Sequence, residues 1–133
     1  MKATLRVRRL IFAGYLLCVL LLSVMPGPES VRLPRFPHLD KVVHFILYAV
    51  MSGLLLNALR SGARRSIKAG LAVVILCSAY GLLLEMLQGV LTESRQMSMG
   101  DFAANFAGAL SGAVFFESAG WIKKTVLWKK YSE

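Results

Sequence analysis

Four long apolar segments constrain this chain more than any other feature of its sequence. A helix needs about 20 residues to cross the hydrocarbon core of a bilayer, and each segment with its flanks is about that long. A histidine or a charged side chain interrupts them only at His44 and Glu117. With 17% charged residues, the chain has too little charge to cover a water-soluble domain of 133 residues. The segments are residues 10–25, 42–59, 69–84 and 102–122.

The pattern within these segments predicts helices rather than the strands of a membrane barrel. A barrel strand alternates polar and apolar residues over about ten positions, whereas residues 73–76 and 82–84 are uniformly apolar. We therefore expect an all-α fold, a four-transmembrane-helix bundle that forms one integral membrane domain over residues 1–133. The expected helices span about residues 8–25, 40–59, 67–91 and 99–122, and residues 26–39, which hold all four prolines, form an external loop.

The basic residues are distributed unevenly between the loops. Twelve of the sixteen lie at the amino terminus, in the loop after residue 59 and in the carboxyl-terminal tail, which fall on one side of a four-helix protein. The positive-inside rule then predicts that both termini are cytoplasmic. Attraction to anionic lipid headgroups accounts for the net charge of +9. Because the chain offers no soluble module, we expect no nucleic-acid partner.

The amino-terminal segment also fits the start of a secretory signal peptide, because basic residues precede a short apolar run. Residues 23–25, just before Pro26, lack the small-x-small pattern of a cleavage site. We therefore expect this segment to remain as a membrane helix. Cys18 and Cys77 fall inside apolar segments, where cysteine behaves as a small apolar residue.

Polar residues enter three of the apolar segments near one predicted face of the membrane. Residues three or four apart share one side of a helix, so the members of each pair lie together. The pairs are Asp40 with His44, Glu85 with Gln88, and Asp101 with Asn105, and Lys41 and Arg95 lie beside them. With both termini cytoplasmic, all eight positions fall on the outer side. An ionisable residue at membrane depth predicts a functional site, and Glu85 in particular needs a partner there.

Structural roles compete with a functional role at most of these positions. Asp40 fits the acidic first turn of a helix, which the helix dipole favours. Residues 98–101 fit a capping box, and Asn105 fits an interhelical hydrogen bond. Capping explains neither why His44 and Glu85 lie within apolar segments nor why the cytoplasmic ends lack equivalents.

Two glycines continue the face of the last polar pair. Gly108 and Gly112 lie four residues apart, and such small residues allow membrane helices to approach closely. We expect this stripe to pack against a neighbouring helix, either within the chain or in a second copy. A homo-oligomer through the last helix is therefore an open alternative.

Residues 40–45, Asp-Lys-Val-Val-His-Phe, resemble the D-K-x-x-H-F signature of the VanZ-like membrane family. A later set of residues resembles a second signature of that family: Glu85, Gln88, Arg95, Ser98, Asp101, Asn105, Gly108 and Gly112. The resemblance covers about residues 36–116. It implies a multi-pass protein of the bacterial cytoplasmic (inner) membrane and cell envelope. It also implies an association with resistance to glycopeptide antibiotics such as teicoplanin, but it carries no catalytic assignment.

The mixed-sign polar residues predict a binding site that faces the periplasm or exterior. The expected ligand is a polar membrane-lipid headgroup, a lipid-linked cell-envelope precursor or a glycopeptide-like molecule. Lys41 and Arg95 would meet its anionic part. The other ligand-binding candidates are Asp40, Gln88 and Asn105, with His44, Glu85 and Asp101 at the centre of the site.

The alternative is an intramembrane enzyme, a hydrolase or transferase acting on an outer-leaflet lipid-linked substrate. His44 and Glu85 would be its acid–base pair, Asp101 would orient the pair or bind a metal, and Arg95 would stabilise phosphate charge. We expect no cofactor, although a histidine with carboxylates can also hold a divalent cation. A proton or ion pathway is disfavoured, because the inner halves of the later segments offer no continuous charged route.

Overall fold

The chain forms four α-helices, and the part that the structure describes contains no strand. This computed structural model describes residues 4–24, 38–59, 66–91 and 98–131, with residues 120–131 in backbone only. The helices are α1 (Leu5–Val24), α2 (Leu39–Leu59), α3 (Ile67–Leu91) and α4 (Met99–Tyr131). The prediction of an all-α fold with four helices is confirmed.

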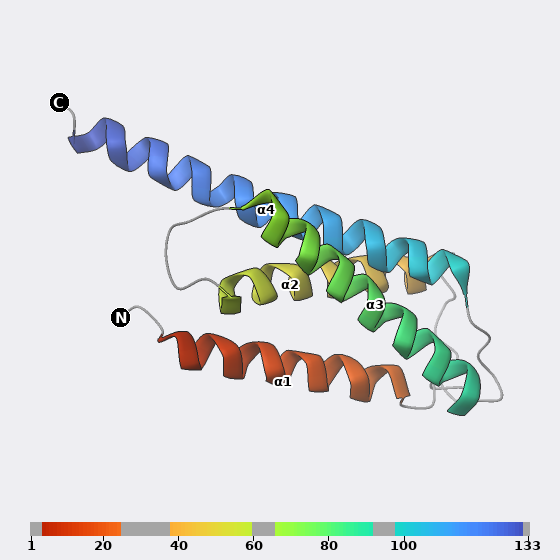
Figure 1. The fold of residues 1–133 in the computed structure, drawn as a ribbon. Helices are drawn as coiled ribbons and strands as arrows, with labels where there is room; N and C mark the ends of the chain where they lie inside the picture. Colours follow the sequence, from red (N-terminus) through yellow and green to blue (C-terminus); the bar gives the residue numbers. More distant parts are fainter. Residues whose placement is uncertain (1–3, 25–37, 60–65, 92–97, 132–133) are drawn as a thin grey trace.

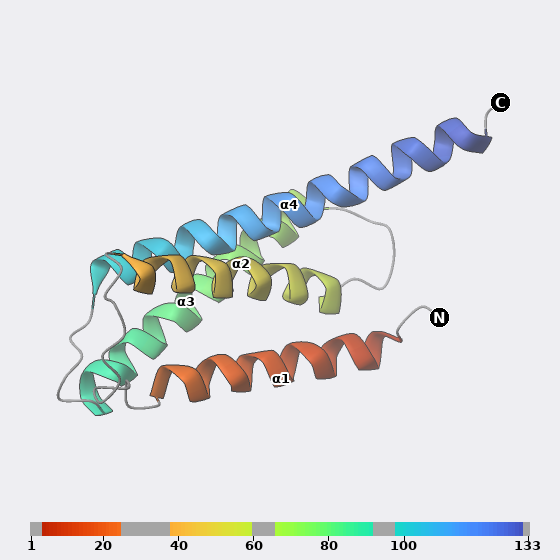
Figure 2. The same ribbon diagram turned by 180° about the vertical axis from the view of Figure 1, so that it is seen from behind.

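Consecutive helices run in opposite directions, so each end of the bundle gathers a fixed set of helix termini. The end of α1, the start of α2, the end of α3 and the start of α4 lie on the right of Figure 1 and on the left of Figure 2. This is hereafter the site end. The start of α1 and the end of α4 lie toward the opposite end (Figure 1). The segments that carry the three predicted polar pairs therefore meet at one end of the molecule.

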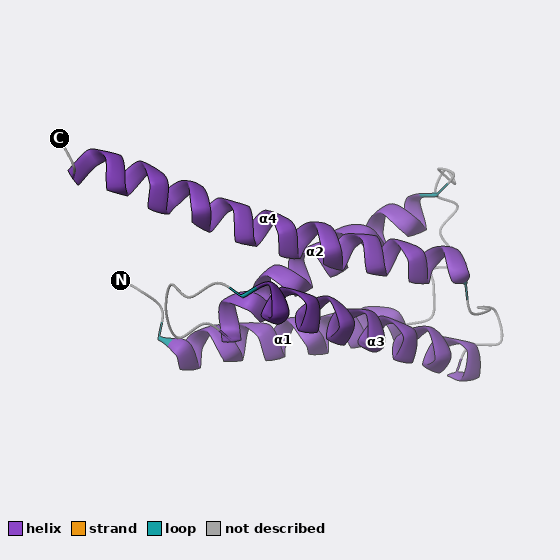
Figure 3. Ribbon diagram, turned by 45° about the horizontal axis from the view of Figure 1, so that its top comes forward, coloured by secondary structure: helices purple, strands orange, loops and turns teal. Residues whose placement is uncertain are grey.

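The last helix is longer than the sequence predicts. We expected it to stop near residue 122, whereas α4 continues without a break to Tyr131. It projects beyond the other helices (Figures 1 and 3). Residues 121–131 contain no proline or glycine, so the sequence holds no signal that would end the helix earlier.

The surface of the bundle has the polarity of a membrane-embedded helical protein. Among the described residues, α1, α2 and residues 67–90 of α3 are long and apolar enough to cross a membrane. Large apolar side chains face outward, with Ile75 66% and Phe115 74% exposed, while Glu85 is only 3% exposed. A water-soluble domain has the opposite arrangement.

Two glycines allow α2 and α4 to pack as the most extensive helix pair. A side-chain carbon on Gly108 would collide with the backbone oxygen of Phe45, and one on Gly112 would collide with the backbone oxygen of Ala49. The predicted small-residue stripe therefore packs within the chain, against α2. A homo-oligomer stays a prediction.

Tyrosine hydroxyls connect α1 to its neighbours. Tyr15 donates a hydrogen bond to the backbone oxygen of Leu47 in α2, at 2.9 Å. Tyr80 of α3 donates to the backbone oxygen of Leu16 in α1, also at 2.9 Å. Because no water competes for these groups between helices in a membrane, such bonds help to hold α1 in place.

The glycine contact predicts a position-dependent loss of stability. Gly108→Ala should destabilise the protein by about 1–3 kcal/mol, because the added methyl group forces α2 and α4 apart. Gly70→Ala is the matched control, since nothing lies within 4 Å of the added carbon, and alanine there should be neutral or slightly stabilising. Thermal unfolding of the purified proteins in detergent, followed by circular dichroism, measures the difference. Equal melting temperatures for the two variants would contradict the packing described.

Candidate functional site

One side chain from each of three helices converges at the site end. His44 of α2, Glu85 of α3 and Asp101 of α4 each offer a nitrogen or oxygen ligand atom, and these atoms all lie within 4.8 Å of one another. Nδ1 of His44 lies 4.0 Å from Oε1 of Glu85. These three residues, hereafter the His–Glu–Asp cluster, are the ones predicted to lie at the centre of the site.

The helix boundaries place His44 and Glu85 at a similar depth. His44 lies five residues after the start of α2, and Glu85 lies six residues before the end of α3. At about 1.5 Å per residue, both lie roughly 8–9 Å inside the site end. Asp101 is in the first turn of α4. His44 and Glu85 therefore lie about a turn and a half below the site end, and Asp101 approaches them from the first turn of α4.

Glu85 completes the cap of α4 in place of Asp101. The Ser98 hydroxyl accepts a hydrogen bond from the Asp101 amide at 3.3 Å, which is one half of the predicted capping box. In a full box, the Asp101 carboxylate would accept the Ser98 amide. Here Oε2 of Glu85 accepts that amide, at 3.3 Å. The Asp101 carboxylate instead faces Lys41, so capping does not account for its position.

Asn105 holds the imidazole ring of His44. Its Oδ1 lies 3.0 Å from Nδ1 of His44. With the amide oxygen toward the ring, Nδ1 carries the proton and donates, and Nε2 keeps its lone pair. Asn105 is 1% exposed, and its Nδ2 has no hydrogen-bond partner among the described residues. Gly81 makes room for this amide, because a side-chain carbon there would lie 2.9 Å from Nδ2.

Lys41 forms the rim of the site. Its ammonium lies 3.0 Å from Oδ2 of Asp40 and 3.4 Å from Oδ1 of Asp101. The side chains of Asp40 and Lys41 are 57% and 38% exposed, so water screens their ion pair and it contributes little to stability. The rim therefore places one positive charge between the solvent-facing side of the site and the His–Glu–Asp cluster.

Gln88, a predicted ligand-binding residue, makes a hydrogen bond outside the cluster. Nε2 of Gln88 donates to the backbone oxygen of Ser23 at 2.9 Å, so this side chain connects α3 to the end of α1. Arg95 lies outside the described residues. The Ser98 amide and the Ser23 carbonyl are partners that sequence reasoning missed, because every residue carries such groups. The one available signal was Ser98 itself, a capping residue before an apolar segment.

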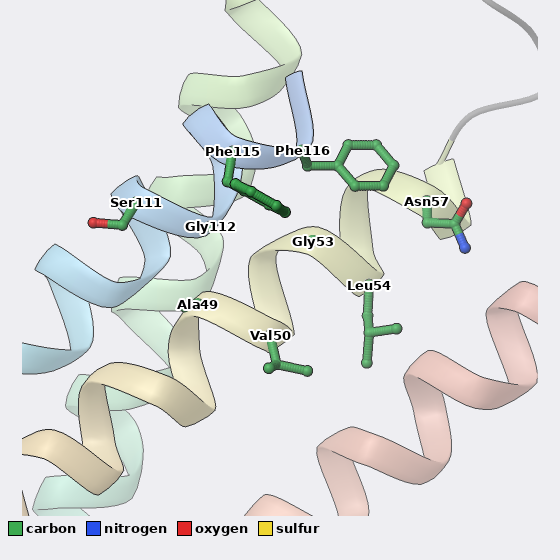
Figure 4. A pocket seen from close by; sticks show the side chains of 9 residues that line it. All are labelled: Ala49, Val50, Gly53, Leu54, Asn57, Ser111, Gly112, Phe115 and Phe116. Atoms are coloured by element: carbon green, nitrogen blue, oxygen red, sulfur yellow. The ribbon is translucent and has the colours of Figure 1, made fainter. Parts of the chain in front are cut away.

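A hollow in the described surface lies away from the His–Glu–Asp cluster. It is a groove of about 500 Å³ between α2 and α4, lined largely by apolar side chains (Figure 4). It begins at Ala49, about 8 Å along α2 from His44, and continues toward the opposite end. The polar chemistry and the groove are therefore adjacent regions of the same helix pair.

Comparison with known proteins gives no match to a protein-family model, a curated protein or a solved structure. The resemblance to the VanZ-like family therefore depends on the quoted residues alone.

Capping by Glu85 predicts a contrast between two substitutions. Glu85→Gln keeps an oxygen for the Ser98 amide and should leave stability unchanged or raise it, because a buried charge is removed. Glu85→Leu leaves that amide unsatisfied and should cost about 1–3 kcal/mol relative to Glu85→Gln. Thermal unfolding in detergent measures both. A leucine variant as stable as the glutamine variant would show that Glu85 does not cap α4.

Proposed function

We propose that the chain is a multi-pass membrane protein whose site end binds a polar lipid headgroup or a lipid-linked envelope precursor from the extracytoplasmic side. One observation carries the proposal. The His–Glu–Asp cluster and Lys41 lie together at one end of a bundle whose sides are apolar. In a bilayer, the end of such a bundle is at the depth of the headgroups.

The chemistry of the site suits a ligand that carries both charge and hydroxyl or amide groups. The Lys41 ammonium offers a positive charge for a phosphate, and Arg95 would add a second. The carboxylates of Asp40 and Asp101 accept hydrogen bonds from hydroxyl or amine groups, and His44 can donate or accept. A lipid-linked precursor and a glycopeptide-like molecule both carry such groups.

The groove between α2 and α4 supports a ligand with a hydrocarbon chain. It opens on the apolar side of the bundle, where Val50 is 45% and Phe115 is 74% exposed. A headgroup held beside Lys41 would leave its chain close to the start of this groove. The site therefore favours a lipid-linked molecule over a fully water-soluble one.

The proposal includes membrane sidedness. The bias of basic residues toward the amino terminus, the loop after residue 59 and the tail supports cytoplasmic termini, with α4 as a fourth span. The site end would then face the periplasm or exterior of a bacterial inner membrane. We also propose that the chain is VanZ-like, supported by Asp40, Lys41, His44 and Phe45 and by the later residues from Glu85 to Gly112. A role in resistance to glycopeptide antibiotics is part of that proposal.

Sidedness predicts which end of the bundle a water-soluble reagent reaches. In a variant without Cys18 and Cys77, Met99→Cys at the site end should react with a membrane-impermeant maleimide in intact cells. Ile67→Cys at the opposite end should react only after the membrane is permeabilised. The two native side chains are 70% and 85% exposed, so both sites are reachable in the folded protein. The reverse labelling pattern would place the site in the cytoplasm.

If the site end binds a headgroup, removing the charge of Lys41 should weaken lipid binding more than removing a carboxylate elsewhere. In nanodiscs, Lys41→Gln should weaken binding of a radiolabelled polyprenyl phosphate about 10- to 100-fold, because a charge-assisted hydrogen bond is lost. Glu117→Gln, near the middle of α4 and away from the site end, should leave binding unchanged. Free inorganic phosphate tests whether the phosphate alone suffices. Absence of saturable binding, or equal affinity for all three proteins, would contradict the proposal.

An intramembrane hydrolase or transferase is the second candidate, favoured by the 4.0 Å separation of His44 and Glu85. In that case the imidazole exchanges a proton with the attacking or leaving oxygen, and the adjacent carboxylate stabilises its charged form. The nanodisc experiment also separates the two candidates. Conversion of the labelled lipid by the native protein, lost in His44→Ala while binding is retained, would favour the enzyme.

A further inference from the structure

We propose that His44, Glu85 and Asp101 bind a single divalent cation of the zinc or manganese type at the site end. The proposal goes beyond the binding of a lipid headgroup and does not depend on it, since the ion is measured without any lipid ligand. Three features support it: the geometry of the cluster, its charge and a buried amide beside it.

The geometry of the cluster is close to that of a bound ion. Metal–ligand bonds to histidine nitrogen and carboxylate oxygen are about 2.0–2.2 Å long, so two ligands of one ion lie at most about 4.4 Å apart. Each of the three residues offers one ligand atom, and these atoms lie within 4.8 Å of one another. Because Nδ1 of His44 donates to Asn105, the ring would bind an ion through Nε2. The atoms are therefore slightly further apart than the ligands of one ion, and the side chains would move together on binding it.

The charges of the cluster also call for a cation. Glu85 is 3% exposed and the side chain of Asp101 is 16% exposed, so both carboxylates are largely removed from water. Within the described part of the chain, Lys41 contacts Asp101, but no lysine or arginine contacts Glu85. Two neighbouring carboxylates and an imidazole are neutralised together by one divalent ion. One imidazole with oxygen ligands suits zinc or manganese better than the all-oxygen set that magnesium prefers.

The buried amide of Asn105 is an independent indication. Its side chain is 1% exposed, its Oδ1 lies 3.0 Å from the His44 ring, and its Nδ2 has no hydrogen-bond partner among the described residues. A buried unsatisfied donor costs about 1–3 kcal/mol, so packing alone does not favour an asparagine here. A hydrogen-bonding group that fixes the ring of a histidine is the usual neighbour of a metal-bound histidine.

Lys41 gives the proposal a test in which the variant should gain affinity. Its ammonium lies 3.4 Å from Oδ1 of Asp101. It therefore competes with an ion for this carboxylate, and its positive charge repels a cation. Removing that charge should tighten ion binding. Loss of folding cannot imitate a gain in affinity, so this variant keeps the proposal falsifiable even if changes at the ligands disturb the fold.

The experiment uses the full chain in detergent micelles, with any polyhistidine tag removed because such tags bind these ions. The protein is dialysed against Zn²⁺ or Mn²⁺ and its metal content is measured by mass spectrometry. Co²⁺ then serves as a spectroscopic probe, since its visible absorption reports nitrogen and oxygen ligation. Each variant is first checked for a monodisperse profile in size-exclusion chromatography.

We expect one ion per native chain and at least a tenfold loss of affinity in His44→Ala and in Glu85→Gln. His38→Ala is the matched control, because His38 is exposed, lies outside the cluster and should be dispensable. Lys41→Met should bind the ion about three- to tenfold more tightly. The proposal is overturned if the native chain binds no stoichiometric ion or if His44→Ala binds it normally. It is also overturned if Lys41→Met shows no gain. If the chain binds no ion but still binds the lipid, the metal proposal fails and the headgroup proposal stands.

Discussion

The close contact between α2 and α4 determines the geometry of everything at the site end. The two helices run in the same direction, and glycines at 108 and 112 bring the backbone of α4 against the carbonyl groups of Phe45 and Ala49. A third glycine, Gly100, lies against the side chain of Lys41. With the two backbones fixed in this register, Lys41 meets Asp101 and His44 meets Asn105. The polar contacts are therefore a consequence of glycine packing one turn further along the helices.

Burial of polar groups at this end has a cost that the apolar packing must offset. The Glu85 carboxylate and the Asn105 amide are almost inaccessible, and the amide lacks one of its hydrogen bonds among the described residues. Elsewhere the core consists of well-packed apolar side chains such as Met51 and Val73. Proteins keep such unfavourable groups most often where binding or catalysis needs them.

The sequence was sufficient for features that depend on one helix at a time. Uncharged length gave the positions of the four helices, and spacing together with the alternation of helix direction predicted that His44, Glu85 and Asp101 approach one another. It was insufficient where the partner is a backbone group or depends on the register between helices. The spacing of Ser98 and Asp101 fits a capping box, but the actual cap uses Glu85 from another helix. Gln88 shares a helical face with Glu85, yet its amide reaches Ser23 of α1.

The hydrogen bonds that reach α1 from α3 have an implication for how this helix can change. Tyr80 and Gln88 both donate to backbone oxygens of α1, at Leu16 and Ser23, about two turns apart. Every residue has a backbone carbonyl group, so these two hydrogen bonds depend on the backbone of α1 and not on the side chains at Leu16 and Ser23. Leu16 and Ser23 can therefore change without loss of either hydrogen bond, whereas Tyr15 of α1 reaches α2 through its own hydroxyl. The attachment of α1 to α3 thus depends on side chains of α3, and its attachment to α2 depends on a side chain of α1.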